Sequence, residues 1–311
     1  LLFKTKRDSF SKNEEAQDRK IVLSKNFRSR KEVLDGVGIF IFGLGSKVLL
    51  ANPLGKLWGQ LDAIGYDSIS TLFAWTGIIA FTFQLYFDFY GYSLMAIGLG
   101  KMMGFKLPQN FNHPYISRSM TEFWRRWHMS LGTWFREYVY IPLGGNRVST
   151  VKHIRNILVV WILTGLWHGA AWNFVLWGLY YGLLLLFEKY VLSKINIPKP
   201  IGWIYTTVLV LIGWVLFSSE NLSQCIQILS AMFGIGNTLF DITSLYYLMT
   251  GGFMLIVCAI CSTPLLKWIK KQLLRFTPGK LLLGCIYVAL FALCTMFLVV
   301  QNYNPFLYFR F

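Results

Sequence analysis

Long apolar runs separated by charged loops dominate the pattern along this chain. A run of about 20 apolar residues spans a bilayer as a helix, whereas a shorter run enters it only in part. The pattern predicts membrane segments, two of them short, over 36–53, 70–88, 89–100, 154–167, 170–188, 202–218, 247–266 and 281–300. We therefore expect an all-α polytopic membrane protein with about seven to eight membrane helices, including short re-entrant ones.

Charge along the loops predicts how these segments are oriented. Lysine and arginine gather in four polar segments, 1–35, 101–155, 189–199 and 267–280. Residues 219–246 contain neither. By the positive-inside rule the four basic segments are cytoplasmic, and residues 219–246 and the tail from Gln301 to Phe311 lie outside. We expect two parts, a basic cytoplasmic segment over 1–35 and a single membrane domain over 36–311.

Residues 120–138 show a different pattern, with apolar and charged side chains on opposite faces of a helix. The apolar positions recur at helical spacing, at Met120, Phe123, Trp124, Trp127, Leu131, Trp134, Phe135 and Tyr138. A helix that is cationic on one side and rich in tryptophan on the other lies in the membrane interface or seals a cavity. This predicts an interfacial helix with His128 at the edge of its apolar face.

The short run 154–167 ends at His168, and the chain returns through 170–188. This pattern predicts a hairpin that places His168 inside the membrane, where irregular backbone must line a cavity or be covered by protein. A titratable side chain at that depth is costly and usually functional. The small residues after it leave room for a substrate, and Asn173 could orient the imidazole or bind a carbonyl oxygen. The alternative is a core histidine bonded to a backbone carbonyl.

Two further polar groups could belong to the same site. His128 could line the cavity, bind substrate or assist proton transfer; alternatively it is an interfacial histidine that packs on tryptophan. Asp88 lies in an aromatic membrane segment and needs a partner, for which Arg125 or Arg126 is the candidate. A structural tie between helices is the favoured role for Asp88, ahead of a catalytic one. His113 and His153 lie in basic loop regions, and we expect them to be ordinary histidines without a functional role.

Composition excludes several classes of protein. The chain is 55% hydrophobic and 14% charged, against about 25% charged residues in soluble domains. Its net charge of +16 comes from residues at the ends of apolar segments, which favours membrane lipids and no nucleic acid. Cys258-Ala-Ile-Cys261 lies inside an apolar run, which favours packing over redox chemistry. No zinc spacing, phosphate loop or dinucleotide fingerprint is present, so we expect no metal and no bound cofactor.

A buried base with no obvious protein nucleophile suggests direct group transfer. His168 would deprotonate a hydroxyl acceptor, which then attacks an activated acyl group. A basic cytoplasmic face suits an anionic donor such as a coenzyme A thioester.

Several sequence words together resemble the membrane-bound O-acyltransferase (MBOAT) family, and within it the alginate O-acetyltransferase branch. The similar stretch runs from about 43 to 188, with the closing 304–311 also similar. Its strongest words are Tyr86-Phe-Asp-Phe-Tyr-Gly-Tyr-Ser93, Leu107-Pro-Gln-Asn-Phe-Asn112, Glu122-Phe-Trp-Arg-Arg-Trp-His128, Tyr140-Ile-Pro-Leu-Gly-Gly-Asn-Arg147 and Gly165-Leu-Trp-His-Gly-Ala170. Teichoic acid D-alanyltransferases share the histidine words, whereas the Pro142-to-Arg147 word favours the polysaccharide-acetylating branch.

The resemblance implies a multi-pass enzyme of the bacterial inner (cytoplasmic) membrane with a central tunnel. It implies that His168 and His128 are the family's two histidines. Acetyl-CoA or another acyl thioester would be the co-substrate, a cell-surface polysaccharide the acceptor, and a separate extracytoplasmic acyltransferase the partner. Residues expected to support the site or bind substrate are Asn173, Asp88, Trp124, Arg125, Arg126, Trp127 and Trp167. Family members carry several more helices before the Gly43 region, so we expect this chain to lack them.

Three other functions stay open at this point. One is D-alanyl transfer to teichoic acid. Another is a transporter in which His168 and Asp88 relay protons or bind substrate, which inverted repeats would favour, although none are evident. The third is an inactive, truncated scaffold for a partner protein.

Overall fold

The computed structural model describes residues 30–65 and 69–300, and the regular structure in these ranges is helical throughout. Six helical stretches are long and apolar enough to cross a membrane. They confirm the predicted all-α, multi-pass class. The residues of the predicted cytoplasmic segment before Arg30, and the closing word 304–311, lie outside the described ranges.

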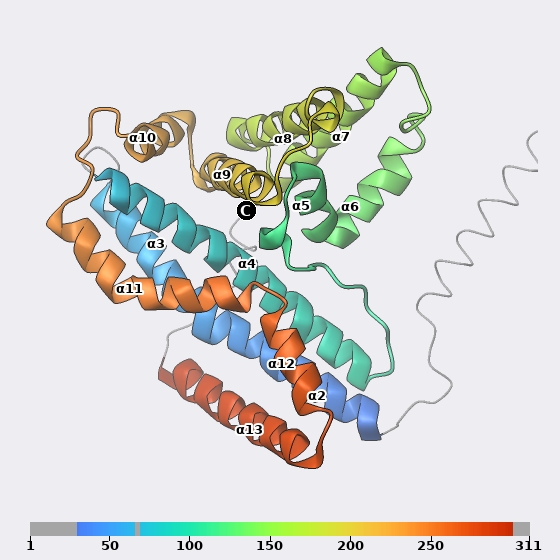
Figure 1. Cartoon of the computed structure of the whole chain (residues 1–311), viewed down its shortest axis with the longest axis vertical. Coiled ribbons are helices and arrows are strands. Elements are labelled where there is room, and N and C mark those ends of the chain that lie inside the picture. Colours follow the sequence, from blue (N-terminus) through green and yellow to red (C-terminus); the bar gives the residue numbers. More distant parts are fainter. Residues whose placement is uncertain (1–29, 66–68, 301–311) are drawn as a thin grey trace, which may run out of the picture.

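One layer is built by two long helical stretches that lie side by side (Figure 1). The first joins α2 (Arg30–Gly45), the π-helical turn η1 (Ser46–Ala51) and α3 (Asn52–Ile64). The second is α4 (Thr71–Met102). A Cβ on Gly43 would lie 2.7 Å from the carbonyl oxygen of Gly91, so the two backbones touch where both residues lack a side chain. In a bilayer such close packing, rather than exclusion of water, holds helices together.

The two predicted segments 70–88 and 89–100 are wrong as separate elements, because α4 continues through both. The predicted boundary falls after Asp88. In the structure, Gly91 lies close to this boundary and is a point of close approach to α2, and packing against α2 keeps the helix continuous there.

The second layer contains the predicted hairpin. It consists of α7 (Thr150–His168) and α8 (Trp172–Tyr190), which confirms the turn after His168. A Cβ on Gly178 would clash with the carbonyl oxygen of Trp161, so the two arms are in backbone contact. Next to α8 lies α9 (Lys199–Ser218), followed by α10 (Leu222–Met232).

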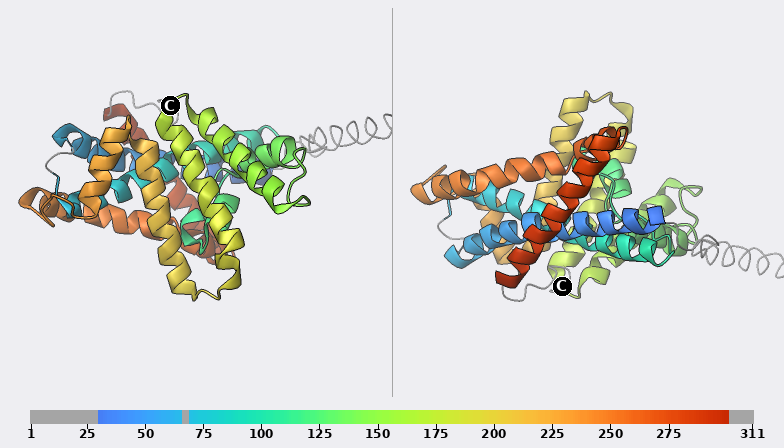
Figure 2. Two further views of the ribbon diagram at one scale, coloured as in Figure 1. Left: turned by 90° about the horizontal axis from the view of Figure 1, so that it is seen from above. Right: turned by 90° about the horizontal axis from the view of Figure 1, so that it is seen from below.

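The C-terminal helices border the first layer. They are α11 (Ile242–Cys261), α12 (Leu265–Leu273) and α13 (Thr277–Val300). Figure 2 shows α13 crossing α2. Many large apolar side chains of α11 and α13 are exposed, as expected for surfaces that face lipid.

The predicted continuous helix over 120–138 is wrong, because it is interrupted in the middle. The chain forms α5 (Met120–Arg126), α6 (Met129–Phe135) and the π-helical turn η3 (Arg136–Tyr140). At the break, Trp127 is extended and His128 is left-handed, with φ 44° and ψ 54°. The break re-aims the chain at His128, and α5 packs against α8 and α9.

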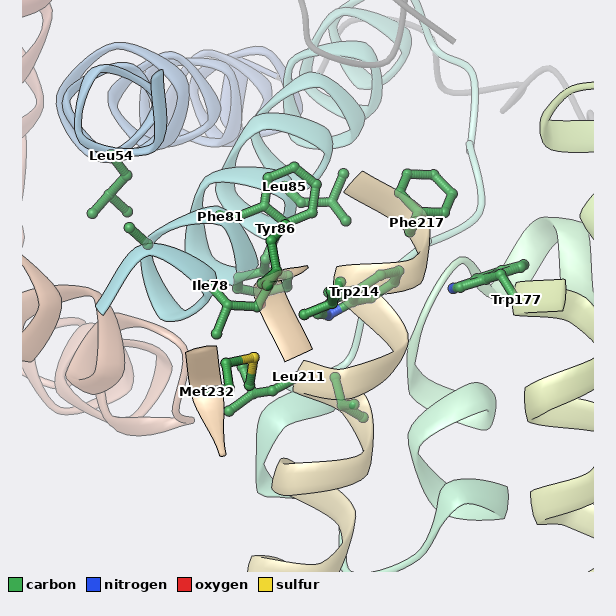
Figure 3. Packing of buried hydrophobic residues seen from close by; sticks show 14 of the residues in the cluster. Leu54, Ile78, Phe81, Leu85, Tyr86, Trp177, Leu211, Trp214, Phe217 and Met232 are labelled. Atoms are coloured by element: carbon green, nitrogen blue, oxygen red, sulfur yellow. The ribbon is translucent and has the colours of Figure 1, made fainter. Parts of the chain in front are cut away.

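Aromatic side chains from both layers form the core between them. Trp177 of α8 and Trp214 of α9 stack with ring centroids 6.3 Å apart, and Phe217 lies beside them (Figure 3). Trp127 packs on Trp214 at 4.9 Å. The break at His128 is therefore anchored directly to this aromatic core.

Candidate active site

A cavity of about 1310 Å³ lies beside the aromatic core, lined by residues of α5, α6, α7 and α8. Both His128 and His168 line it. A second void of about 10 Å³ is lined by the same two histidines and by Trp177 and Phe217. Although 40 residues separate the histidines in the sequence, the fold brings them to one site.

His168 is the last residue of α7, and aromatic rings surround it. The centroid of its imidazole ring lies 5.1 Å from the ring centroid of Trp177, 5.1 Å from that of Phe217 and 4.9 Å from that of Trp167. In each pair the two ring planes are nearly perpendicular. Such packing fixes the plane of the ring. The hairpin supplies Trp167 and Trp177 while α9 supplies Phe217, so three helices orient this histidine.

His128 approaches the cavity from the break between α5 and α6. Its ring lies edge-to-face on Phe89 of α4 at 4.8 Å, and 5.9 Å from the ring of Trp167. Burial lowers the pKa of His128 to about 3, and the positive charge of a protonated His168 lowers it as well. His128 is therefore neutral at physiological pH, with one ring nitrogen as a donor and the other as an acceptor.

The rim of the cavity is strongly cationic. Arg118, Arg125, Arg136 and Lys189 line it and are exposed, whereas Glu188 is the carboxylate among the lining residues. Such an excess of positive charge attracts anionic ligands. The cationic residues come from the two segments that the positive-inside rule places in the cytoplasm, 101–155 and 189–199.

The other expected site residues separate into two groups. Trp124, Arg125 and Trp127 line the large cavity. Arg126 lies outside its lining, where its Nη2 pairs with Glu122 at 2.8 Å. The side-chain nitrogen of Asn173 donates to the carbonyl oxygen of Ser219 at 2.8 Å, which ties the start of α8 to the end of α9.

The expected arginine partner for Asp88 is a wrong prediction, because Asp88 forms an ion pair with Lys47 of η1. Both side chains are buried. The sequence signal was a lone lysine inside an apolar run, since a buried lysine needs an acid as much as a buried aspartate needs a base. The pair ties the two long stretches of the first layer together and lies outside the lining of both cavities.

Glu188, whose side chain caps the N-terminus of α5, was missed in the sequence analysis. Its carboxylate accepts hydrogen bonds from the backbone nitrogens of Met120 and Thr121, and from the Thr121 hydroxyl at 2.8 Å. A carboxylate at a helix N-terminus satisfies free N–H groups and meets the positive end of the helix dipole. The signal, a lone Glu near the end of an apolar run, could have been read as a polar tie.

His153, expected to be ordinary, is buried and fully engaged near the rim. Its ring nitrogens bond the hydroxyls of Tyr140 at 3.0 Å and Tyr190 at 2.9 Å, and the ammonium of Lys189 at 2.9 Å. Nearby, the side-chain nitrogen of Asn156 donates to the carbonyls of Leu143 and Gly145. These bonds fasten η3 and the turn after it to the α7–α8 hairpin.

In the part of the chain that the structure describes, no group of three or more His, Cys, Asp or Glu side chains is placed to hold a metal ion. The groups that line the cavity are two imidazoles, aromatic rings and a cationic rim.

The sequence of this chain is similar to those of one protein family. The sequence model of the MBOAT, membrane-bound O-acyltransferase family matches residues 19–226. A probable alginate O-acetylase (AlgI) of Azotobacter vinelandii is 45% identical over 228 residues, covering 71% of this chain and 45% of that protein. The Pseudomonas putida protein of the same name is 37% identical over 315 residues, covering 93% of this chain and 64% of that protein.

A Helicobacter pylori peptidoglycan O-acetyltransferase is 39% identical over 209 residues, covering 64% of this chain and 39% of that protein. The chain spans about half the length of the curated relatives it matches. The matched family region contains both histidines of the cavity and all four cationic residues of its rim.

Proposed function

Because the chain belongs to the membrane-bound O-acyltransferase family, we propose that it moves an acyl group from a cytoplasmic thioester to hydroxyl groups of a cell-surface polysaccharide. The acyl group is acetyl and the donor is acetyl-CoA. The observation that carries this proposal is that His128 and His168 line one cavity whose rim is cationic.

His168 is the general base of the proposed reaction. Its imidazole removes the proton from the acceptor hydroxyl as the oxygen attacks the thioester carbonyl carbon, forming a tetrahedral oxyanion. When that intermediate collapses, the carbon–sulfur bond breaks, and the imidazolium returns its proton to the departing thiolate. The products are an O-acyl ester and a free thiol. The aromatic rings around His168 hold the imidazole in position and keep water away from the thioester.

His128 assists as a neutral imidazole that faces the same cavity. In the tautomer that donates into the cavity, its N–H stabilises the carbonyl oxygen as negative charge develops. Its low pKa suits this role, because a neutral imidazole keeps the donor N–H without adding a positive charge beside the base.

The cationic rim receives the donor. Arg118, Arg125, Arg136 and Lys189 attract the phosphate groups of coenzyme A, and the aromatic interior accepts the acyl thioester end. This arrangement suits a donor that approaches from the cytoplasmic side of a bacterial inner membrane.

The acceptor side of the proposal rests on the relatives. Their names give alginate and peptidoglycan as the acetylated polymers, both of which are cell-surface polysaccharides. We assign this chain the same class of acceptor, with a separate extracytoplasmic acyltransferase completing delivery.

The test is the O-acetyl content of the surface polysaccharide in cells whose full-length protein carries His168→Gln. We expect loss of acetylation while the protein accumulates normally in the membrane. The matched control is His113→Asn, a similar exchange at a histidine outside the cavity lining that keeps a residue tolerant of its left-handed backbone (φ 49°). Normal acetylation in the His168→Gln strain would overturn the proposal.

A further inference from the structure

The backbone at His128 needs support from elsewhere in the chain. His128 is left-handed and occupies the N-cap position of α6, yet its side chain makes no capping hydrogen bond. A non-glycine residue is disfavoured in this conformation because its Cβ comes close to the following carbonyl oxygen. The helix that begins here also has free N–H groups that a capping side chain normally satisfies.

Asn110 provides the missing cap from a segment 20 residues earlier. Its side-chain oxygen accepts hydrogen bonds from the backbone nitrogen of Ser130 at 3.2 Å and from the Ser130 hydroxyl at 2.6 Å. Its backbone carbonyl accepts from the nitrogen of Met129 at 3.0 Å. Asn110 therefore satisfies the first two residues of α6, directly after His128.

The same segment holds the chain before His128. The backbone nitrogen of Asn112 donates to the carbonyl of Arg126 at 3.0 Å, and the carbonyl of Asn112 accepts from Nη1 of Arg126 at 3.0 Å. The Asn112 side chain is not used in these bonds, and the residue is exposed. Residues 110–112 thus form hydrogen bonds with the chain on both sides of the Trp127–His128 break.

One face of α4 contacts both Asn110 and the imidazole of His128. The side-chain nitrogen of Asn110 donates to the hydroxyl of Ser93 at 3.3 Å. One turn earlier on α4, the ring of Phe89 packs edge-to-face against the imidazole of His128. Because Phe89 and Ser93 are four residues apart on a helix, they lie on the same face.

We propose that Asn110 is a positioning residue of the acyl-transfer site: its side chain holds His128 in the left-handed conformation that directs the imidazole into the cavity shared with His168. The inference rests on the proposed function, in which His128 takes part in the reaction. Catalytic groups must be held close to their productive geometry, and a misplacement of about 1 Å costs on the order of 100-fold in rate.

The experiment compares Asn110→Ala with Asn112→Ala in membranes that contain the full-length protein. Transfer of labelled acetyl from acetyl-CoA to the polysaccharide is measured. For Asn110→Ala we expect kcat to fall roughly 10- to 100-fold with the donor KM within about 2-fold. For Asn112→Ala we expect kcat and the donor KM to stay within about 2-fold of wild type, because Asn112 bonds Arg126 through its backbone and not its side chain. Asn110→Asp, which keeps a side-chain oxygen that can accept from Ser130, restores kcat to within about 5-fold of wild type.

A double variant separates positioning from general loss of stability. In a His128→Asn protein, which keeps a residue tolerant of the left-handed backbone, adding Asn110→Ala produces no further loss of rate. A further loss as large as in the wild-type background would overturn the inference. If Asn110→Ala does not accumulate, Ser93→Ala removes the support of Asn110 from α4, and kcat falls roughly 3- to 10-fold.

The two proposals fail in different ways. Full activity in His168→Gln removes the proposed function. Loss of activity in His168→Gln and His128→Asn, with Asn110→Ala and Ser93→Ala within about 2-fold of wild type, overturns only the role of Asn110.

Discussion

Lys47 of η1 and Asp88 of α4 form a buried ion pair that joins the two long helical stretches of the first layer. The two residues are 41 positions apart in the sequence. Removing one partner of a buried pair leaves an uncompensated charge, which costs about 3 to 5 kcal/mol, whereas replacing both with apolar residues is often neutral.

We therefore expect Lys47→Met alone to lower the thermal midpoint of the detergent-purified protein, and Lys47→Met with Asp88→Leu to recover most of that loss. Thermal unfolding followed by tryptophan fluorescence measures both. A double variant less stable than Lys47→Met alone would contradict the account of this pair as a structural tie.

Glu188 offers a second test of stability. Glu188→Gln removes the charge that caps α5, and we expect a loss of about 1 to 2 kcal/mol in the free energy of unfolding. The matched control is Glu122→Gln, whose bonds with the Arg126 guanidinium and the exposed Arg118 backbone nitrogen are less buried, and for which we expect less than about 1 kcal/mol. Equal losses in the two variants would show that the capping contacts are unimportant.

The low pKa of His128 predicts how stability depends on pH. The unfolded histidine titrates near 6.5 and the folded one near 3, so the unfolded state binds more protons between these values. Stability from this group is complete above about pH 6.5 and decreases as the pH falls toward 3. At 1.36 kcal/mol per unit, the loss by pH 4.5 is roughly 2 to 3 kcal/mol.

The measurement is thermal unfolding of wild type and His128→Asn at pH 7 and pH 4.5. We expect the acid shift to be smaller in His128→Asn because the titrating group is absent. An equal shift in both proteins would contradict the burial of a neutral imidazole at this position.

The cationic rim predicts a change in donor binding without a change in chemistry. Arg125→Gln or Arg136→Gln should raise the KM for acetyl-CoA roughly 3- to 10-fold, leave kcat within about 2-fold, and weaken the dependence of KM on salt. The control is Lys270→Gln on α12, outside the cavity lining. An unchanged KM in both rim variants would argue against donor entry at this rim.

Much of the fold follows from the hydrophobic pattern, because bilayer-length apolar runs leave the chain few alternatives to spanning helices. The α7–α8 hairpin was predicted from a short run that ends at His168. The prediction divides 70–88 from 89–100, whereas α4 runs through both, because Gly91 packs against α2 and because Asp88 at the predicted boundary is paired with Lys47.

The break at His128 could not be predicted from local sequence. Apolar residues recur at helical spacing straight through 120–138, so periodicity favours one helix. The interruption is stabilised by hydrogen bonds with Asn110 and Asn112, which come close to the break only in the folded chain. The ion pair of Lys47 with Asp88 likewise depends on contact between distant segments, whereas the two histidines were identifiable from their aromatic surroundings.

The central claim is that His168 is the base for acyl transfer, and single-turnover transfer in membranes tests it most directly. Labelled acetyl-CoA is mixed with membranes containing wild type or His168→Gln in the presence of acceptor polysaccharide, and ester-linked label is followed with time. We predict that His168→Gln binds the donor with an unchanged Kd but transfers acetyl on the order of 100- to 10,000-fold more slowly. Transfer within about 2-fold of the wild-type rate would contradict the claim.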